Sequence, residues 1–97
     1  MFIEIIDFKE SMTESGTFLG YLTVEIPEAG IVLGDIKLNQ KMPDKIWIYL
    51  PCKRLREPNG EIRWKPIFSF SDPEKQVEFV ENLTRVAEAF LASREEV

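Results

Sequence analysis

Hydrophobic and polar residues alternate through much of the first half of the chain, and such alternation predicts half-buried β-strands. The pattern is clearest over residues 17–26, where one face would carry Phe18, Gly20, Leu22, Val24 and Ile26. Residues 2–8 and 31–39 predict a first and a third strand, the third with Val32, Ile36 and Leu38 on one side. Polar or turn-forming segments at residues 10–16 and 27–30 separate the three strands.

Two further strands are expected in the second half of the chain. Residues 46–50 (IWIYL) are apolar on both sides, which predicts a central strand. Pro51 ends or bulges that strand, because proline cannot donate to a sheet ladder. Residues 61–70 predict a fifth strand that bends at Pro66, and residues 41–44 (KMPD) predict a turn.

An amphipathic helix is expected after the strands. Ser71 with Glu74 has the spacing of a capping box, whereas Asp72 followed by Pro73 predicts an N-cap with proline at the first helical position. The apolar stripe that would pack on the sheet consists of Phe79, Val80, Leu83, Val86, Ala87, Phe90 and Leu91. The sequence therefore predicts one α+β domain over residues 1–97, with about five mainly antiparallel strands and one C-terminal amphipathic α-helix packed on the sheet.

A basic β-hairpin is predicted around Asn59-Gly60, because both residues tolerate the positive φ of a type I′ turn. With these two residues as the loop, the opposed pairs are Glu57/Ile62, Arg56/Arg63, Leu55/Trp64 and Arg54/Lys65. One face would then carry the four cations Arg54, Arg56, Arg63 and Lys65, whose mutual repulsion suggests an external anion or an acidic neighbour. Pro58 leaves a second possibility, a three-residue loop, which would reverse every face assignment.

The charge of the chain is unevenly distributed. The net charge of the 97 residues is −5. Residues 1–36 hold seven acids and one base, residues 37–65 hold eight bases and three acids, and residues 66–97 hold seven acids and three bases. Such asymmetry favours a local anion site on the hairpin. The alternative is a solvated surface on which the acidic helix neutralises the basic strands.

Candidate catalytic chemistry is sparse, so we expect no enzyme and no cofactor. The absence of histidine excludes His-based triads and His-containing metal sites, and a single cysteine excludes a thiolate zinc site. The glycines match no phosphate-binding loop. Cys52 precedes Lys53 and Arg54, and cations favour a thiolate, but a small packing residue after a strand is the more common role. Asp35 is expected to form an ion pair, either with a hairpin cation or elsewhere on the surface.

Aromatic residues near the basic hairpin add a second kind of candidate contact. Trp47 and Tyr49 share a face of their predicted strand, and Trp64 is expected nearby. Rings beside arginines are used by proteins that stack the bases of single-stranded nucleic acid. For Trp47, a place in the core is the alternative that we favour, because its strand is apolar on both sides.

The expected location is the cytoplasm. The longest apolar runs are only a few residues, too short to span a membrane. Glu4 and Asp7 interrupt the apolar N-terminal stretch, which argues against a signal peptide. A single cysteine fits a reducing compartment.

Several segments of the sequence resemble the SpoVG family, the stage V sporulation (septation) protein G group. The matching segments are GDIKL at 34–38, WIYLPCKR at 47–54, NGEIR at 59–63 and PI at 66–67. The P-x-K-R spacing and the turn-G-E-x-R spacing are the most specific parts of a resemblance that covers residues 17–91. Cys52 stands where the family has serine, and the segment between Arg63 and Pro66 is shorter and lacks the family's histidine.

The resemblance implies a cytoplasmic bacterial regulator, homodimeric through strand pairing, that binds DNA and RNA. Lys53 and Arg54 match the family motif directly, and Arg63 matches the turn motif. Our functional hypothesis is a homodimeric nucleic-acid-binding regulator whose phosphate contacts come from Lys53, Arg54, Arg56, Arg63 and Lys65, with Tyr49 or Trp64 stacking on a base. The rival hypothesis is a protein-interaction module whose basic face binds an acidic partner or the acidic helix of a second copy.

Overall fold

The computed structural model describes residues 1–11, 16–42 and 45–95. Its elements in chain order are β1 (Glu4–Glu10), β2 (Phe18–Ile26), β3 (Ile31–Met42), β4 (Lys45–Tyr49), β5 (Cys52–Arg56), β6 (Ile62–Pro66) and α1 (Pro73–Glu95). All strand pairs are antiparallel and α1 contacts the sheet, so the predicted α+β class is confirmed. Residues 12–15 of the predicted loop at 10–16, and residues 43–44 of the predicted turn at 41–44, lie outside the described residues.

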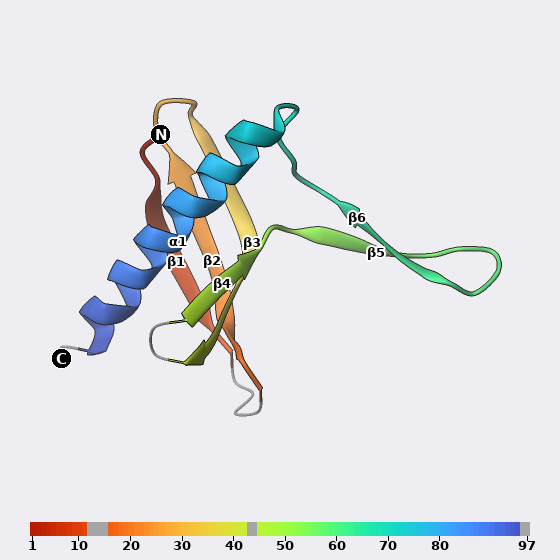
Figure 1. The fold of residues 1–97 in the computed structure, drawn as a ribbon, viewed down its shortest axis with the longest axis horizontal. Coiled ribbons are helices and arrows are strands. Elements are labelled where there is room, and N and C mark those ends of the chain that lie inside the picture. The colour runs from red at the N-terminus through yellow and green to blue at the C-terminus, as the bar shows by residue number, and fades with distance from the viewer. Residues whose placement is uncertain (12–15, 43–44, 96–97) are drawn as a thin grey trace.

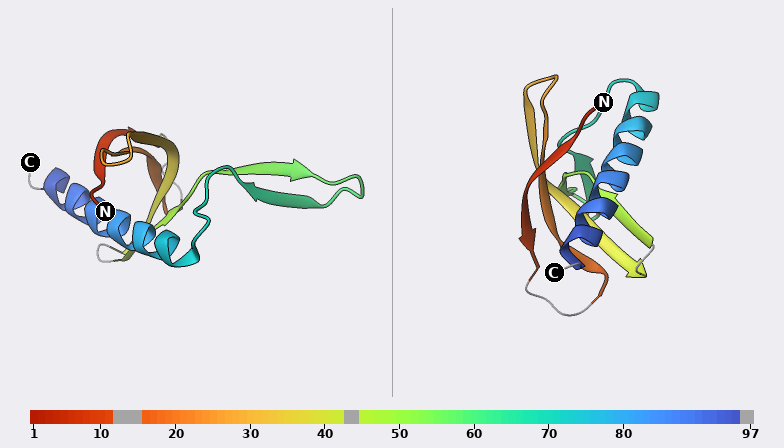
Figure 2. Two further views of the ribbon diagram at one scale, coloured as in Figure 1. Left: turned by 90° about the horizontal axis from the view of Figure 1, so that it is seen from above. Right: turned by 90° about the vertical axis from the view of Figure 1, so that its left-hand side faces the viewer.

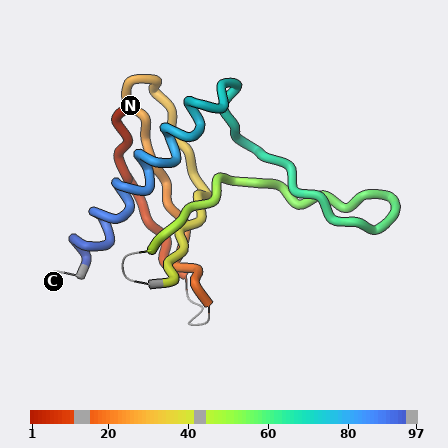
Figure 3. Tube along the Cα trace, viewed as in Figure 1, coloured from red at the N-terminus to blue at the C-terminus, as the bar shows by residue number. Residues whose placement is uncertain are grey.

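The strands form two separate sheets. A four-stranded sheet has the order β1-β2-β3-β4, and among the described residues β5 pairs only with β6, in a hairpin that we call the arm. Figure 1 shows the arm projecting away from the four-stranded sheet and α1, and Figure 3 shows its two strands diverging toward the body, one continuing from β4 and the other leading to the start of α1. The amide of Ile67 donates to the carbonyl of Pro51 at 3.0 Å, which closes the base of the arm. The predicted fifth strand thus ends at Pro66 instead of continuing past it.

The hydrophobic core lies between the four-stranded sheet and α1. Fully buried side chains come from β2 (Leu22 and Val24), β3 (Ile36 and Leu38) and α1 (Phe79, Leu83 and Ala87). Figure 1 shows α1 crossing one face of the sheet, as the apolar stripe predicts. The helix begins at Pro73, and the Oδ1 atom of Asp72 accepts a hydrogen bond from the amide of Glu74 at 3.0 Å. Of the two predicted helix starts, the one capped by Asp72 is therefore confirmed.

A β-bulge in β3 changes which residues of this strand face the core. The pairing with β2 shifts between Leu22 and Val24, where Asp35 adopts a positive φ of 56°. Because the extra residue reverses the alternation, Leu33 packs on the core and Val32 is exposed. The prediction that Val32 shares the buried side with Ile36 and Leu38 is wrong at this one position.

The face of the four-stranded sheet turned away from α1 is called the outer face here. Figure 2 shows that α1 lies on one side of the sheet only, and none of the described elements packs on the other side. Ile46 and Ile48 of β4 pack on the core, whereas Tyr49 is exposed. β4 is an edge strand, so the prediction of a central strand at residues 46–50 is wrong. Its apolar pattern on both sides reflects aromatic residues on an open face.

Candidate nucleic-acid interface

The loop at the tip of the arm has three residues, not two. The amide of Glu57 donates to the carbonyl of Glu61 at 2.8 Å, and the amide of Gly60 donates to the carbonyl of Glu57 at 2.9 Å. Gly60 has a positive φ of 90°, and Asn59 Oδ1 accepts from the amide of Glu61 at 3.0 Å. A two-residue loop would need an amide hydrogen at position 58 to bond across the ladder, and Pro58 has none.

The three-residue loop shifts the predicted strand pairing by one residue, so the predicted faces of the hairpin are wrong. Arg54 lies opposite Trp64, Arg56 opposite Ile62, Lys53 opposite Lys65 and Leu55 opposite Arg63. One side, which we call the Trp64 face, carries Cys52, Arg54, Arg56, Ile62 and Trp64. The other side, the Lys65 face, carries Lys53, Leu55, Arg63 and Lys65. The four cations that were predicted on one face are therefore divided equally between the two.

The cations of the arm are exposed and largely uncompensated. Arg63 Nε lies 3.4 Å from Glu57 Oε1. The other four cations form no ion pair with any described residue: Lys53, Arg54, Arg56 and Lys65. The predicted ion pair of Asp35 with a hairpin cation is likewise not formed within the described ranges. The arm therefore presents positive charge to solvent on both of its faces, with an excess available to an external anion.

The Trp64 face of the arm continues onto the outer face of the sheet. A groove of about 380 Å³ at this junction is lined by Lys37, Tyr49, Leu50, Cys52 and Trp64. Tyr49 and Trp64 are each 58% exposed, so both rings remain open to a ligand. The expectation that Trp64 lies near Tyr49 is confirmed by their shared groove. Lys37 was missed as a site residue, although its position opposite Tyr49 in the β3–β4 ladder places it there.

Two side chains lie in surroundings that differ from their predicted ones. Cys52 is exposed and belongs to β5, where its Sγ donates to the carbonyl of Leu50 at 3.5 Å. It lines the groove and is not a packing residue after a strand. Trp47 is half-buried on the outer face, opposite Asn39, and does not belong to the described core cluster. The prediction of a core position for Trp47 is therefore wrong.

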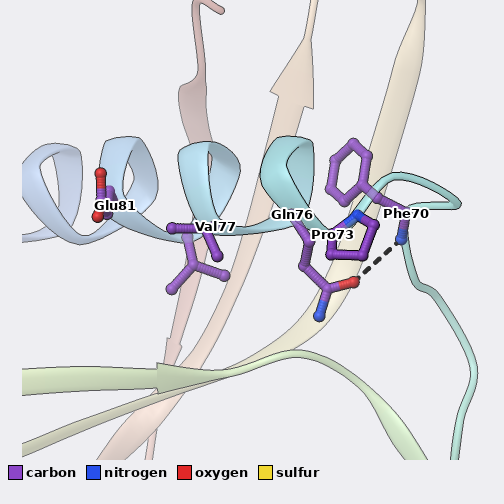
Figure 4. A pocket seen from close by; sticks show the side chains of 6 residues that line it. Phe70, Pro73, Gln76, Val77 and Glu81 are labelled. Carbon is purple, nitrogen blue, oxygen red and sulfur yellow. Dashed lines mark hydrogen bonds between the residues drawn. The ribbon is translucent and has the colours of Figure 1, made fainter.

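A second groove lies beside the start of α1 (Figure 4). It has a volume of about 480 Å³ and is lined by Phe70, Pro73, Gln76, Val77, Val80 and Glu81. The Gln76 side chain accepts a hydrogen bond from the amide of Phe70 at 3.1 Å. The groove is mainly apolar and contains no cluster of cations, which makes it a poorer match to an anionic ligand than the junction groove.

The arrangement at the arm and the junction groove offers two kinds of interaction. Exposed guanidinium and ammonium groups bind anions, and exposed rings stack on planar groups. No three His, Cys, Asp or Glu side chains within the described ranges come together in a group that could hold a metal ion. In the same part of the chain, α1 is not apolar enough to cross a membrane.

The seven predicted site residues thus divide into two groups. Tyr49 and the Trp64-face residues Arg54, Arg56 and Trp64 lie on one continuous surface, whereas Lys53, Arg63 and Lys65 lie on the other side of the arm.

Comparison of the chain with protein-family models, with curated proteins and with solved structures gave no match in any of the three.

Proposed function

We propose that this chain is a small homodimeric regulatory protein of the cytoplasm that binds DNA or RNA through the Trp64 face of its arm. The observation that carries the proposal is the placement of Arg54 beside Trp64 on a face that continues to the exposed ring of Tyr49. Arg56 extends this surface toward the tip of the arm. The resemblance to the SpoVG family suggested the same class of ligand.

The physical basis of binding is the combination of cations and open rings. Arginines neutralise phosphates and release condensed counterions, which gives affinity without sequence preference. Tyr49 and Trp64 supply ring faces on which bases of a single strand can stack. Lys53, Arg63 and Lys65, on the Lys65 face, strengthen the positive potential that attracts a polyanion to the arm.

The arm also supports the proposal of a homodimer. An isolated two-stranded hairpin is marginally stable in water, and β5 and β6 each have one edge without a described partner strand. Ile62 and Trp64 are about half exposed on this hairpin. A strand from a second copy at one of these edges would complete hydrogen bonds that the arm leaves open.

The experiment that tests this function is fluorescence anisotropy with labelled single-stranded DNA, duplex DNA and RNA at two salt concentrations. Arg54→Glu is compared with Arg63→Glu, a matched variant with the same charge change on the opposite face. We expect salt-sensitive binding that Arg54→Glu weakens by about tenfold or more, equivalent to one strong charge-assisted contact. Arg63→Glu, which removes a cation already paired with Glu57, should weaken binding less.

Two results would contradict the proposal. Equal losses in Arg54→Glu and Arg63→Glu would show that binding does not depend on the Trp64 face. Absence of binding to all three probes at low salt would exclude nucleic acid as the ligand. The rival function, a protein-interaction module that binds an acidic partner through the arm, would then be favoured.

A further inference from the structure

The outer face of the four-stranded sheet carries a row of alternating lysines and tyrosines. Lys9 of β1 lies opposite Tyr21 of β2, Tyr21 lies opposite Lys37 of β3, and Lys37 lies opposite Tyr49 of β4. Their strand neighbours Phe8, Leu22, Ile36 and Ile48 belong to the core or pack on it. Because side chains alternate along a strand, all four row residues point to the outer face. We call them the Lys–Tyr row.

The row is accessible along its whole length. Lys9 and Lys37 are exposed, and neither forms an ion pair with a residue in the described ranges. Tyr21 is 38% exposed and Tyr49 is 58% exposed. Adjacent strands are about 4.8 Å apart, so the row extends over about 14 Å from β1 to β4. At its β4 end it reaches the junction groove, where Tyr49 and Lys37 meet Trp64.

The ring of Tyr21 is held in place by a second aromatic ring. The centroids of Phe18 and Tyr21 are 5.1 Å apart, and the rings meet edge to face at 73°. Such a contact fixes the orientation of the tyrosine before a ligand arrives, which reduces the entropy lost on binding. On the same face, Asp7 lies opposite Thr23, and Glu4 lies opposite Glu25 farther from the row. Asp35, two residues before Lys37, is exposed.

We propose that a single-stranded nucleic acid continues from the arm across the outer face, following the Lys–Tyr row. Tyr49 and Tyr21 would stack on bases, and Lys37 and Lys9 would contact the phosphates between them. This inference rests on the proposed function and extends it in two ways. It assigns the ligand to the single-stranded class, and it adds Lys9, Tyr21 and Lys37 to the binding surface.

Charge argues for a nucleic-acid strand over a second copy of the chain as the occupant of this face. A two-fold interface brings the same patch of two copies together. Two Lys–Tyr rows placed face to face would bring four lysines into one interface, with no acid in either row to pair with them. A polyanionic strand with planar bases complements both the lysines and the tyrosines.

The test compares oligothymidylates and oligouridylates of about 4 and about 12 nucleotides, which span the site sizes of known single-strand-binding domains. Binding is measured by anisotropy on the full chain. Tyr21→Ala removes the stacking ring and Tyr21→Phe keeps it. Lys9→Gln removes the cation most distant from the arm, and Lys75→Gln is the matched control on α1. Circular dichroism confirms that each variant is folded.

We expect the wild type to bind the longer oligonucleotide more tightly than the shorter one, and the Tyr21→Ala and Lys9→Gln variants to lose this difference in affinity. Tyr21→Ala should weaken binding of the longer probe by at least about fivefold, as loss of one base–aromatic stack predicts. Tyr21→Phe should bind as the wild type does. Lys9→Gln should reduce the salt slope by about 0.7, whereas Lys75→Gln should leave it unchanged.

Three results would overturn the inference, and they separate it from the proposed function. If Tyr21→Ala and Lys9→Gln bind both probes as the wild type does while Arg54→Glu binds weakly, the arm binds nucleic acid and the outer face does not. If light scattering shows that Tyr21→Ala converts a dimer to a monomer, a second copy covers this face. If the wild type binds duplex DNA but neither of these single-stranded probes, the inference fails and the proposed function stands; if it binds none of them, the proposed function fails as well.

Discussion

We predict that Gly20→Ala, which adds a single methyl group, disrupts the outer face of the sheet. This glycine lies in β2 opposite Glu10 of β1 and has a positive φ of 156°. A Cβ atom at this position would overlap the carbonyl oxygen of Lys9 and lie 2.9 Å from Cε1 of Phe8. Because the Lys9 oxygen belongs to the backbone, it cannot rotate away as a side chain could. Gly20→Ala must therefore move β1 away from β2.

The expected cost has two parts. Overpacking of a closely packed site costs about 1–3 kcal/mol. An L-residue held in a backbone region that is normally restricted to glycine costs about 1–3 kcal/mol more. We therefore expect Gly20→Ala to lower the free energy of unfolding by about 2–6 kcal/mol, a large fraction of the about 5–15 kcal/mol typical of a domain. The same displacement would separate Lys9 from Tyr21.

The measurement is urea-induced unfolding followed by circular dichroism. Gly34→Ala is the matched control, because a Cβ there has Thr23 Oγ1 at 3.7 Å as its nearest atom, an ordinary contact. The control should change the free energy of unfolding by no more than about 0.5 kcal/mol. If Gly20→Ala proves no less stable than Gly34→Ala, the described approach of β1 to β2 is incorrect.

Two further predictions concern the helix cap and the tip of the arm. Asp72→Ala removes the acceptor of the Glu74 amide and should lower the free energy of unfolding, measured in urea, by about 1 kcal/mol, whereas Ser71→Ala should have little effect. Equal effects would contradict the assigned cap. Glu57→Gln removes the partner of Arg63 at 3.4 Å, and it should change stability by no more than about 1 kcal/mol. Because it also removes a negative charge from the arm, affinity for nucleic acid should rise, and a fall would contradict the proposed interface.

The main elements of the body could be predicted because their patterns are local. Leu22 and Val24 alternate with polar residues, and the stripe that contains Phe79 and Leu83 has helical spacing, so both elements were predicted correctly. The predicted core face of β2 is wrong at Phe18, because a bulge between Phe18 and Gly20 packs Leu19 on the core instead. The arm was predicted with the wrong register because Asn59-Gly60 alone favours a two-residue loop. Pro58 excludes that loop because it has no amide hydrogen to donate across the ladder, and the Asn59-Gly60 dipeptide does not show this.

The candidate site was predicted only in part, because its geometry depends on contacts between strands. The bulge at Asp35 reverses the side-chain alternation of β3, and the sequence pattern of the strand does not predict this bulge. Residues 46–50 are apolar on both sides, and this pattern is the same for a strand covered on both faces and for a strand with aromatic residues on an open face. The alignment of Tyr21 with Lys37 follows from the β2–β3 register, which the periodicity of one strand cannot supply.

The measurement that tests the proposed interface most directly is the fluorescence of Trp64 during titration with single-stranded DNA and RNA. The chain has two tryptophans, and Trp47→Phe leaves Trp64 as the only one. Stacking of a base on the exposed Trp64 ring should quench its emission, and added salt should restore it as the phosphate contacts are lost. Arg54→Glu in the same background should require more nucleic acid for the same quenching. Binding detected by anisotropy with no change in Trp64 emission would contradict the assignment of the Trp64 face.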